Sequence, residues 1–255
     1  MDQLNHFADG RLLVGCIYCG GVEETRDHAP SRVFLDEPFP DNLPVVPACF
    51  ECNNRLSLDE EYVACLVESA IAGSTDPDQV RRPCVADILR RSPALAARIA
   101  SARHTSGDLV RFDVEHQRVR NVILKLARAH AAFDLSLPLR QDPQIAKWRP
   151  LHLMTGEERD SYEAAHVVGL FGEVGSRGMQ RLMVTQVTLQ TSTGESKAID
   201  YIINDWVEVQ ENRYRYHAID DDDEVRVKIV IGEYLACDVA WRHYEVTLAS
   251  ALRPD

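Results

Sequence analysis

The residues whose types and spacing most clearly predict chemistry are four cysteines near the start of the chain. They form two C-x-x-C pairs, Cys16 with Cys19 and Cys49 with Cys52, separated by 29 residues. Each pair supplies two thiolates from one tight turn, and four thiolates surround Zn²⁺ tetrahedrally at about 2.3 Å. One pair alone would equally suit a redox site. Two pairs at this spacing predict a closed structural zinc site with no open position for substrate.

Any catalysis must therefore come from other side chains. Asp27 and His28 lie between the two cysteine pairs, and Asn53 directly follows the second pair. Because zinc would hold both segments on one small scaffold, we expect these three side chains to converge. An imidazole with a pKa near ~6.5 accepts a proton at neutral pH. The oxygens of Asp and Asn suit a hard divalent cation that also binds phosphate oxygens.

The same residues carry a resemblance to a known family. The motifs, in chain order, are Cys16-x-x-Cys19, Asp27-His28-x-Pro30, Asn42-Leu43 and Cys49-x-x-Cys52-Asn53. Over about residues 15–68 this combination resembles the HNH endonuclease family in its four-cysteine form. The continuation from Val46 to Tyr62 is similar to a bacterial branch of that family. The resemblance assigns no function to the remaining two-thirds of the chain.

The resemblance implies a zinc-stapled ββα-metal (treble-clef-like) module, a β-hairpin followed by a helix, with one catalytic divalent cation. It implies that His28 is the general base, and that Asp27 and Asn53 ligate Mg²⁺ or Mn²⁺. Asn42 would be the central asparagine, which braces the loop behind His28. The sequence departs from the family in two places: many members have histidine where Asn53 stands, and the spacing from Asn42 to Cys49 is two residues longer than usual.

The implied activity is hydrolysis of phosphodiester bonds in nucleic acid, with DNA as the expected substrate. Such modules tend to occur in bacterial defence and on mobile elements. Two other interpretations stay open. In the first, the zinc scaffold only recognises nucleic acid or a protein, and His28 orders a turn. In the second, the β-rich C-terminal part sets the function, and the zinc module docks a protein partner. The intact set of Asp27, His28 and Asn53 favours the enzyme.

The net charge of −12 is unevenly distributed along the 255 residues. Residues 1–70 carry 4 basic and 13 acidic side chains, residues 71–150 carry 14 and 8, and residues 151–255 carry 10 and 19. Phosphate contacts are expected in the basic residues 71–150. The alternative is that these charges only lie on solvent-exposed helix faces. The candidates are Arg81, Arg82, Arg90, Arg91, Arg103, Arg118, Arg120, Lys125 and Arg128.

The composition is that of a soluble globular protein, with 45% hydrophobic and 27% charged residues. No stretch approaches the ~20 apolar residues of a membrane helix, and the first residues lack the features of a secretory signal. A cytoplasmic protein without membrane contact is therefore expected. The three remaining cysteines, Cys65, Cys84 and Cys237, are predicted to be small core residues.

The elements that must position these residues indicate an α+β fold in three parts. We expect a zinc-binding module over residues 1–75, a helical basic segment over 76–140, and a β-rich domain over 150–255, with a linker within Pro138 to Pro150. Predicted helices cover 57–72, 84–91, 93–103 and 116–133; the first begins at a capping box of Ser57 and Glu60. Predicted strands cover 110–114, 167–171, 182–190, 199–203, 214–219 and 225–231, the last two forming a hairpin around an acidic turn. His116, His130, Trp148, Trp206 and Trp241 are expected to serve packing or solvation.

Overall fold

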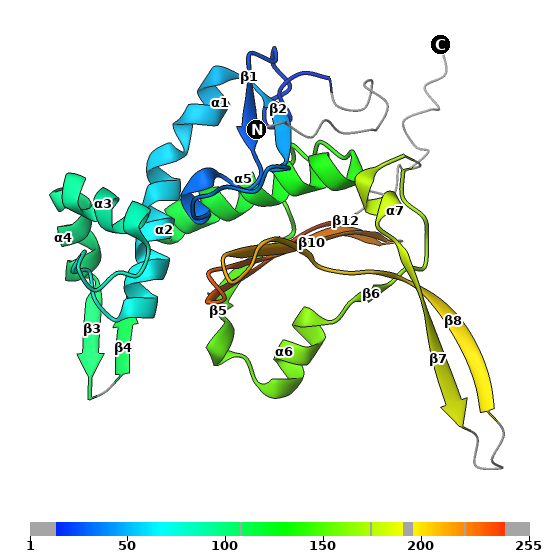
Figure 1. Ribbon diagram of the computed structural model, residues 1–255. Helices are drawn as coiled ribbons and strands as arrows, with labels where there is room; N and C mark the ends of the chain where they lie inside the picture. The colour runs from blue at the N-terminus through cyan, green and yellow to red at the C-terminus, as the bar shows by residue number, and fades with distance from the viewer. Residues whose placement is uncertain (1–13, 108, 174, 191–195, 222, 243–255) are drawn as a thin grey trace, which may run out of the picture.

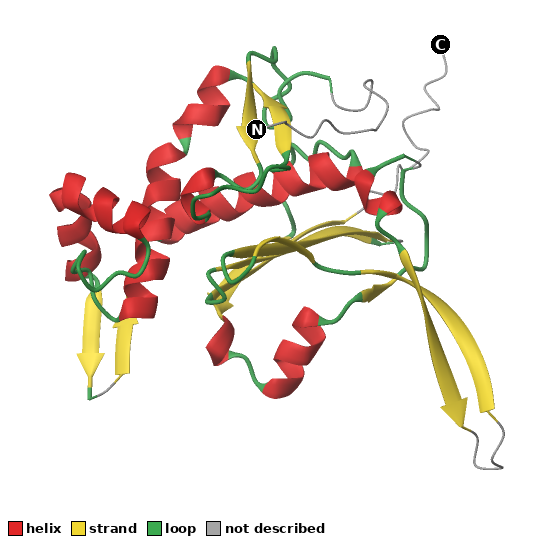
Figure 2. Cartoon of the chain, viewed as in Figure 1, coloured by secondary structure: helices red, strands yellow, loops and turns green. Residues whose placement is uncertain are grey.

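The computed structural model describes residues 14–107, 109–173, 175–190, 196–221 and 223–242 (Figure 1). An N-terminal hairpin leads into a group of helices, and a β-rich part follows (Figure 2). The predicted α+β class is confirmed at this level. The N-terminal elements are β1 (Thr25–His28), η1 (Arg32–Phe34), β2 (Val45–Ala48), α1 (Phe50–Arg55) and α2 (Ser57–Ala72).

The middle of the chain is helical, as its apolar periodicity predicts. Its elements are α3 (Pro83–Arg91), α4 (Pro93–Ser101), the hairpin β3 (Arg103–Ser106) and β4 (Leu109–Phe112), and α5 (His116–Leu135). Helix α5 is buried on nearly all sides from Val122 onward. It therefore forms the centre of the fold, against which the other layers pack.

The largest sheet has five antiparallel strands in the order β5-β12-β11-β10-β9. They are β5 (Ile145–Pro150), β9 (Val207–Gln210), β10 (Tyr214–Asp221), β11 (Glu224–Ile231) and β12 (Leu235–Arg242). Helix α5 lies on one face and α6 (Gly156–Glu163) on the other (Figures 1 and 2). The Tyr162 hydroxyl of α6 bonds the carbonyls of Ile229 and Cys237, which holds the helix on the sheet. The predicted β10–β11 hairpin is confirmed, with Asp221 paired to Glu224 at its turn.

A second, smaller sheet has the order β6-β8-β7. Its strands are β6 (His166–Val167), β7 (Met183–Gln190) and β8 (Ser196–Asn204), and the short helix α7 (Arg177–Gln180) precedes β7. Strands β7 and β8 extend away from the rest of the molecule as a two-stranded ribbon (Figure 1). The expected strand over 167–171 is wrong beyond Val167, because only two residues there pair with β8.

One large apolar core joins the helical and β-rich parts. It contains Tyr62 of α2, Val122 of α5, Tyr216 of β10 and Trp241 of β12. Trp241 is thus a core aromatic, whereas Trp148 and Trp206 are half-buried. In the described part of the chain no helix is long and apolar enough to cross a membrane.

His130, near the C-terminal end of α5, is completely buried in this core. Its ring stacks on Tyr216 with 3.7 Å between the ring centroids, and its Nε2 atom lies 2.8 Å from the Tyr214 hydroxyl. His116, at the other end of α5, is exposed. Burial lowers the pKa of His130 to about 3, so this residue is a neutral packing element.

Three local predictions are wrong. Ser57 does not cap α2: Leu56 takes the N-cap position without a side-chain cap, and Glu60 points into the interior. Cys84 is exposed, although Cys65 and Cys237 are buried as expected. Residues 145–150 of the expected linker form β5, which pairs with β12 over six residues. These residues form an edge strand because they pair with the buried strand β12, although the segment is rich in proline.

Candidate functional site

The first cysteine pair lies on a tight loop that glycine makes possible. The Cys16 backbone N–H donates to the Gly21 carbonyl at 2.8 Å, and Gly20 donates back to Cys16 at 2.8 Å. Gly15 has φ of +73°, and a Cβ there would lie 2.5 Å from the Gly21 oxygen. No larger residue fits at position 15 without opening the loop.

The second pair lies at the start of a helix. Cys49 is the N-cap of α1, and its sulfur accepts a hydrogen bond from the Cys52 backbone N–H at 3.4 Å. The backbone N–H groups at the N-terminus of α1 therefore lie close to these sulfurs.

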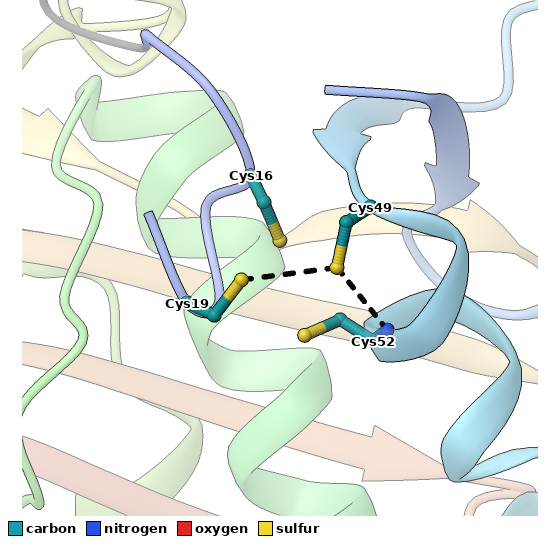
Figure 3. Close-up of side chains that lie close together, drawn as sticks. All are labelled: Cys16, Cys19, Cys49 and Cys52. Atoms are coloured by element: carbon teal, nitrogen blue, oxygen red, sulfur yellow. Dashed lines mark hydrogen bonds between the residues drawn. The ribbon is translucent and has the colours of Figure 1, made fainter. Parts of the chain in front are cut away.

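The four sulfurs form one cluster, drawn in Figure 3, that can hold a metal ion. Their ligand atoms all lie within 4.8 Å of one another, and the sulfurs of Cys19 and Cys49 are 3.7 Å apart. Four sulfurs at about 2.3 Å from Zn²⁺ would be roughly 3.8 Å from one another. The geometry and the donor set therefore fit a tetrahedral thiolate site, and the predicted grouping of the four cysteines is confirmed.

The electrostatics of Cys16 also favour metal binding. Burial opposes ionisation of its thiol, but backbone N–H groups of Cys49, Cys19 and Tyr18 stabilise the thiolate and lower its pKa to about 7. A thiolate, and not a thiol, is the form that binds a metal.

Beside the cluster, β1 and β2 pair antiparallel, with Asp27 opposite Val46 and His28 opposite Val45. Helix α1 follows β2 directly, so the order hairpin then helix is the one that the resemblance implies. Because successive side chains of a strand point to opposite faces, Asp27 and His28 point away from each other. Asp27 is only 4% exposed, whereas His28 is half-buried.

The Asp27 carboxylate takes part in a buried polar network. Its Oδ2 atom accepts a hydrogen bond from the Tyr18 hydroxyl at 2.7 Å and lies 3.0 Å from the Lys125 ammonium. The same ammonium lies 2.8 Å from Glu60, which also accepts a hydrogen bond from the Ser31 hydroxyl. One buried cation thus serves two buried carboxylates. Burial opposes the charge on Lys125, but the two carboxylates raise its pKa, so it stays an ammonium.

His28 ends β1 beside an arginine. The Arg32 guanidinium approaches His28 Nε2 at 3.2 Å. Since a guanidinium can only donate, Nε2 must be the acceptor and the imidazole is neutral. Burial and the positive charge of Arg32 together lower the pKa of His28. The unprotonated nitrogen is the form that a general base requires.

The two asparagines are placed differently. The Asn53 amide nitrogen lies 3.4 Å from both the Thr25 hydroxyl and the Arg26 carbonyl, so Asn53 lies against β1 and its Oδ1 atom is not used in these contacts. Asn42 is exposed in a turn, and its side chain makes no hydrogen bond to another described residue. No contact among the described residues therefore supports the expectation that Asn42 braces the loop behind His28.

The pair of Asp27 and Asn53 does not present an open site for Mg²⁺ or Mn²⁺ in this arrangement. Asp27 is buried, and its Oδ2 atom already serves Tyr18 and Lys125. A divalent cation at Asp27 would have to compete with the Lys125 ammonium for the same carboxylate. These residues therefore fit a catalytic cation less well than the cysteines fit a structural one.

Some of the basic residues expected to contact phosphate are internal. Arg82 is 2% exposed; its guanidinium donates to Asp36 at 2.7 Å and to the Leu35 carbonyl at 2.6 Å. Lys125 is 4% exposed. For these two residues the prediction of a surface phosphate contact is wrong. Arg81 and Arg91 are exposed, so a surface contact with phosphate stays a prediction for them.

The residues that sequence reasoning missed are those that complete the network. Lys125 was counted as a surface charge and Glu60 as a helix cap. One signal favoured burial of Lys125: it is the only charged residue in the apolar run from Val122 to Ala127. Its partners were not readable, because Asp27 and Glu60 lie far from it in sequence.

Comparison of the chain with models of known protein families found no match, and comparisons with curated proteins and with solved structures found none either. The likeness to HNH endonucleases consequently depends on the motif residues alone.

Proposed function

We propose that the chain is an HNH-type endonuclease that hydrolyses phosphodiester bonds in nucleic acid, with DNA as its expected substrate and the four cysteines holding a structural Zn²⁺. The observation that carries the proposal is the position of His28. It ends a hairpin strand fastened beside the four-cysteine cluster, and its Nε2 atom is an unprotonated acceptor next to a guanidinium.

In this proposal His28 Nε2 accepts the proton of a water whose oxygen attacks phosphorus; the bond from phosphorus to the leaving ester oxygen breaks, and that oxygen takes a proton from a solvent water. Arg32 has no carboxylate partner among the described residues, so its charge is available to a phosphate oxygen. Approach of a phosphate would draw Arg32 from Nε2 and free the lone pair for the water.

Mg²⁺ or Mn²⁺ is the expected catalytic cation, since such ions neutralise charge on a phosphate under attack. Asn53 Oδ1 is one proposed ligand. Asp27 is the other, and it becomes available only if Lys125 releases its carboxylate. The exposed part of the basic segment is the proposed nucleic-acid contact, and its affinity should then fall steeply with salt.

Cleavage of supercoiled plasmid in Mg²⁺ or Mn²⁺ tests the proposal. The wild type is compared with His28→Ala and with His104→Ala, a matched change of an exposed histidine on β3, away from β1 and β2. Zinc content is determined for all three. We expect cutting by the wild type and by His104→Ala, and a loss of at least ~100-fold in His28→Ala at full zinc content. Equal cutting by all three would remove His28 from the mechanism.

A second candidate function is a zinc-stabilised module that binds nucleic acid or protein without cleaving. The observation that favours it is the burial of Asp27 in an ion pair with Lys125, where a cation ligand would be needed. Salt-dependent DNA binding without cleavage in any divalent cation would support this candidate over the nuclease.

A further inference from the structure

The ribbon of β7 and β8, here called the arm, has exposed side chains along most of β7. Its two strands pair from Met183 with Ile203 to Gln190 with Ser196. Strand β6 adds only His166 and Val167 at the base. Figure 1 shows the arm projecting past the edge of the main sheet, on the side of the molecule away from β1 and β2. An isolated two-stranded ribbon is marginally stable in water, so we expect contact with a further partner to stabilise the arm.

Exposed apolar side chains are concentrated at the arm. Twelve large apolar side chains of the described chain are exposed, and seven of them belong to the arm or to the segment at its base: Val167, Leu170, Phe171, Met183, Val184, Val187 and Leu189. Single exposed apolar residues are ordinary, whereas a contiguous group marks an interaction surface.

The two faces of the arm differ. On one face Met183, Thr185, Val187 and Leu189 of β7 lie beside Ile203, Tyr201, Ile199 and Lys197 of β8. On the other face Gln186 donates a hydrogen bond to Asp200 at 2.9 Å and Thr188 and Gln190 are polar, while Val184 lies beside Ile202 near the base of the arm. The arm therefore has one face on which apolar residues predominate, and this face is exposed mainly along β7.

The two edges of the arm differ as well. Strand β8 carries Lys197 and Asp200, charges of the kind that discourage pairing with another strand. Strand β7 has eight consecutive residues without a charge, proline or glycine, and among the described strands it pairs with β8 alone. The β7 edge is thus open to a further strand.

Charge indicates which partner fits. The chain carries a net charge of −12, so two copies repel each other over most of their surfaces. In the described part of the arm the charges of Lys197 and Asp200 cancel. A neutral strand is a surface through which two acidic copies can meet. It offers no cationic stripe to nucleic acid.

We propose that the chain forms a two-fold symmetric homodimer in which β7 of one copy pairs antiparallel with β7 of the other. The apolar faces stay on the same side of the joint sheet only if odd-numbered residues lie opposite odd-numbered ones and even-numbered residues lie opposite even-numbered ones. Placing Gln186 opposite Gln186 meets this condition, and it sets Met183 opposite Leu189 and Thr185 opposite Val187. The result is a continuous four-stranded sheet, β8-β7-β7-β8, with one apolar side. This dimer does not depend on the proposed reaction.

Light scattering of the full chain after size exclusion tests the oligomeric state. We expect a dimer for the wild type at micromolar concentration. Val187→Lys, which puts a charge on the apolar face of β7, should be a monomer. Ala198→Lys is the matched control, because it adds the same charge to the polar face of β8. It should remain a dimer. A monomeric wild type, or a dimer that Val187→Lys leaves intact, would overturn the proposal.

Cross-linking tests the register without relying on loss of association. In a Cys84→Ser background, Gln186→Cys should be joined between copies by a short bis-maleimide, since directly opposite residues lie about 5 Å apart. Ala198→Cys is equally exposed but would lie at least about 14 Å from its counterpart across three strand spacings. A dimer that cross-links through Ala198→Cys and not through Gln186→Cys would place the interface elsewhere and refute the pairing.

Discussion

The Lys125 ammonium lies 3.0 Å from the carboxylate of Asp27, so the central helix neutralises the residue that precedes His28 in β1. The same ammonium lies 2.8 Å from Glu60 of α2. Three elements distant in sequence are therefore joined at one buried cation. This contact ties the cysteine-bearing hairpin to the core of the protein.

Replacement of Lys125 by Met should be strongly destabilising. It leaves two buried carboxylates without their counter-charge, and removal of one partner from a buried ion pair costs about 3–5 kcal/mol. The free energy of unfolding from urea titrations measures the loss. Lys147→Met is the control, since Lys147 is exposed on β5 and its replacement should change stability by less than about 0.5 kcal/mol. Similar losses in both variants would argue against the buried network.

Metal content should depend on the cluster cysteines alone. We expect one Zn²⁺ per chain by elemental analysis, and loss of this metal in Cys16→Ser or Cys49→Ser. Cys84→Ser should keep its zinc, because Cys84 is exposed and lies outside the cluster. Removal of the metal by a chelator should lower the thermal midpoint of the wild type, since binding energy at such sites is folding energy. A chain that purifies without metal yet melts at the same temperature after zinc addition would contradict this.

Arg81 and Arg82, which directly precede α3, should differ in how much their replacement lowers the stability of the protein. Arg82→Ala removes a buried guanidinium, so the carbonyls of Val33 and Leu35 lose their hydrogen bond from it and Asp36 keeps Arg213 but loses Arg82. We expect a loss of about 3–5 kcal/mol in the free energy of unfolding. Arg81→Ala changes an exposed side chain and should cost less than about 0.5 kcal/mol. If only Arg81→Ala weakens DNA binding at native stability, Arg81 contributes to the contact surface; a destabilised Arg81→Ala would show that it is structural too.

Acid should destabilise the protein partly through His217. This residue is fully buried on β10, and burial together with the charge of Lys228 lowers its pKa to about 4. Between about pH 6.5 and 4 the unfolded chain binds a proton here and the folded chain does not. Stability therefore falls as the pH falls through this window, by up to about 1.4 kcal/mol per pH unit for this group.

The His217→Leu variant isolates that contribution. Both ring nitrogens of His217 are without a hydrogen-bond partner in the described structure, so the replacement removes the ring contact with Trp206 but no hydrogen bond of the ring. Urea titrations across the window should give a shallower pH slope than the wild type. Parallel slopes would show that folding does not lower the pKa of His217.

Local patterns in the sequence predicted much of the fold. Apolar periodicity predicted α5, and strict alternation predicted the β10–β11 hairpin with its acidic turn. The spacing of the two C-x-x-C pairs predicted the cluster of cysteines. In each case the signal lies within a few residues of the element that it describes, or in a ligand set whose geometry is strongly constrained.

Contacts between distant segments were not predictable in the same way. Glu60 has the right spacing from Ser57 for a capping box, but the buried ammonium of Lys125 binds its carboxylate instead. Residues 145–150 have a loop-like composition and become a strand only because β12 offers them a pairing edge. The partners that decided these outcomes lie more than sixty residues away, where periodicity carries no information.

The exposed thiol of Cys84 also makes the protein easy to label. Cys65 and Cys237 are buried, and a bound metal would occupy the other four thiols, so a fluorophore on a maleimide should attach at a single place, on α3. The number of thiols that react then reports whether the cluster is loaded. Dye stoichiometry near one marks metal-bound protein, and higher stoichiometry marks protein that has lost its metal, which gives a spectroscopic quality check before any assay.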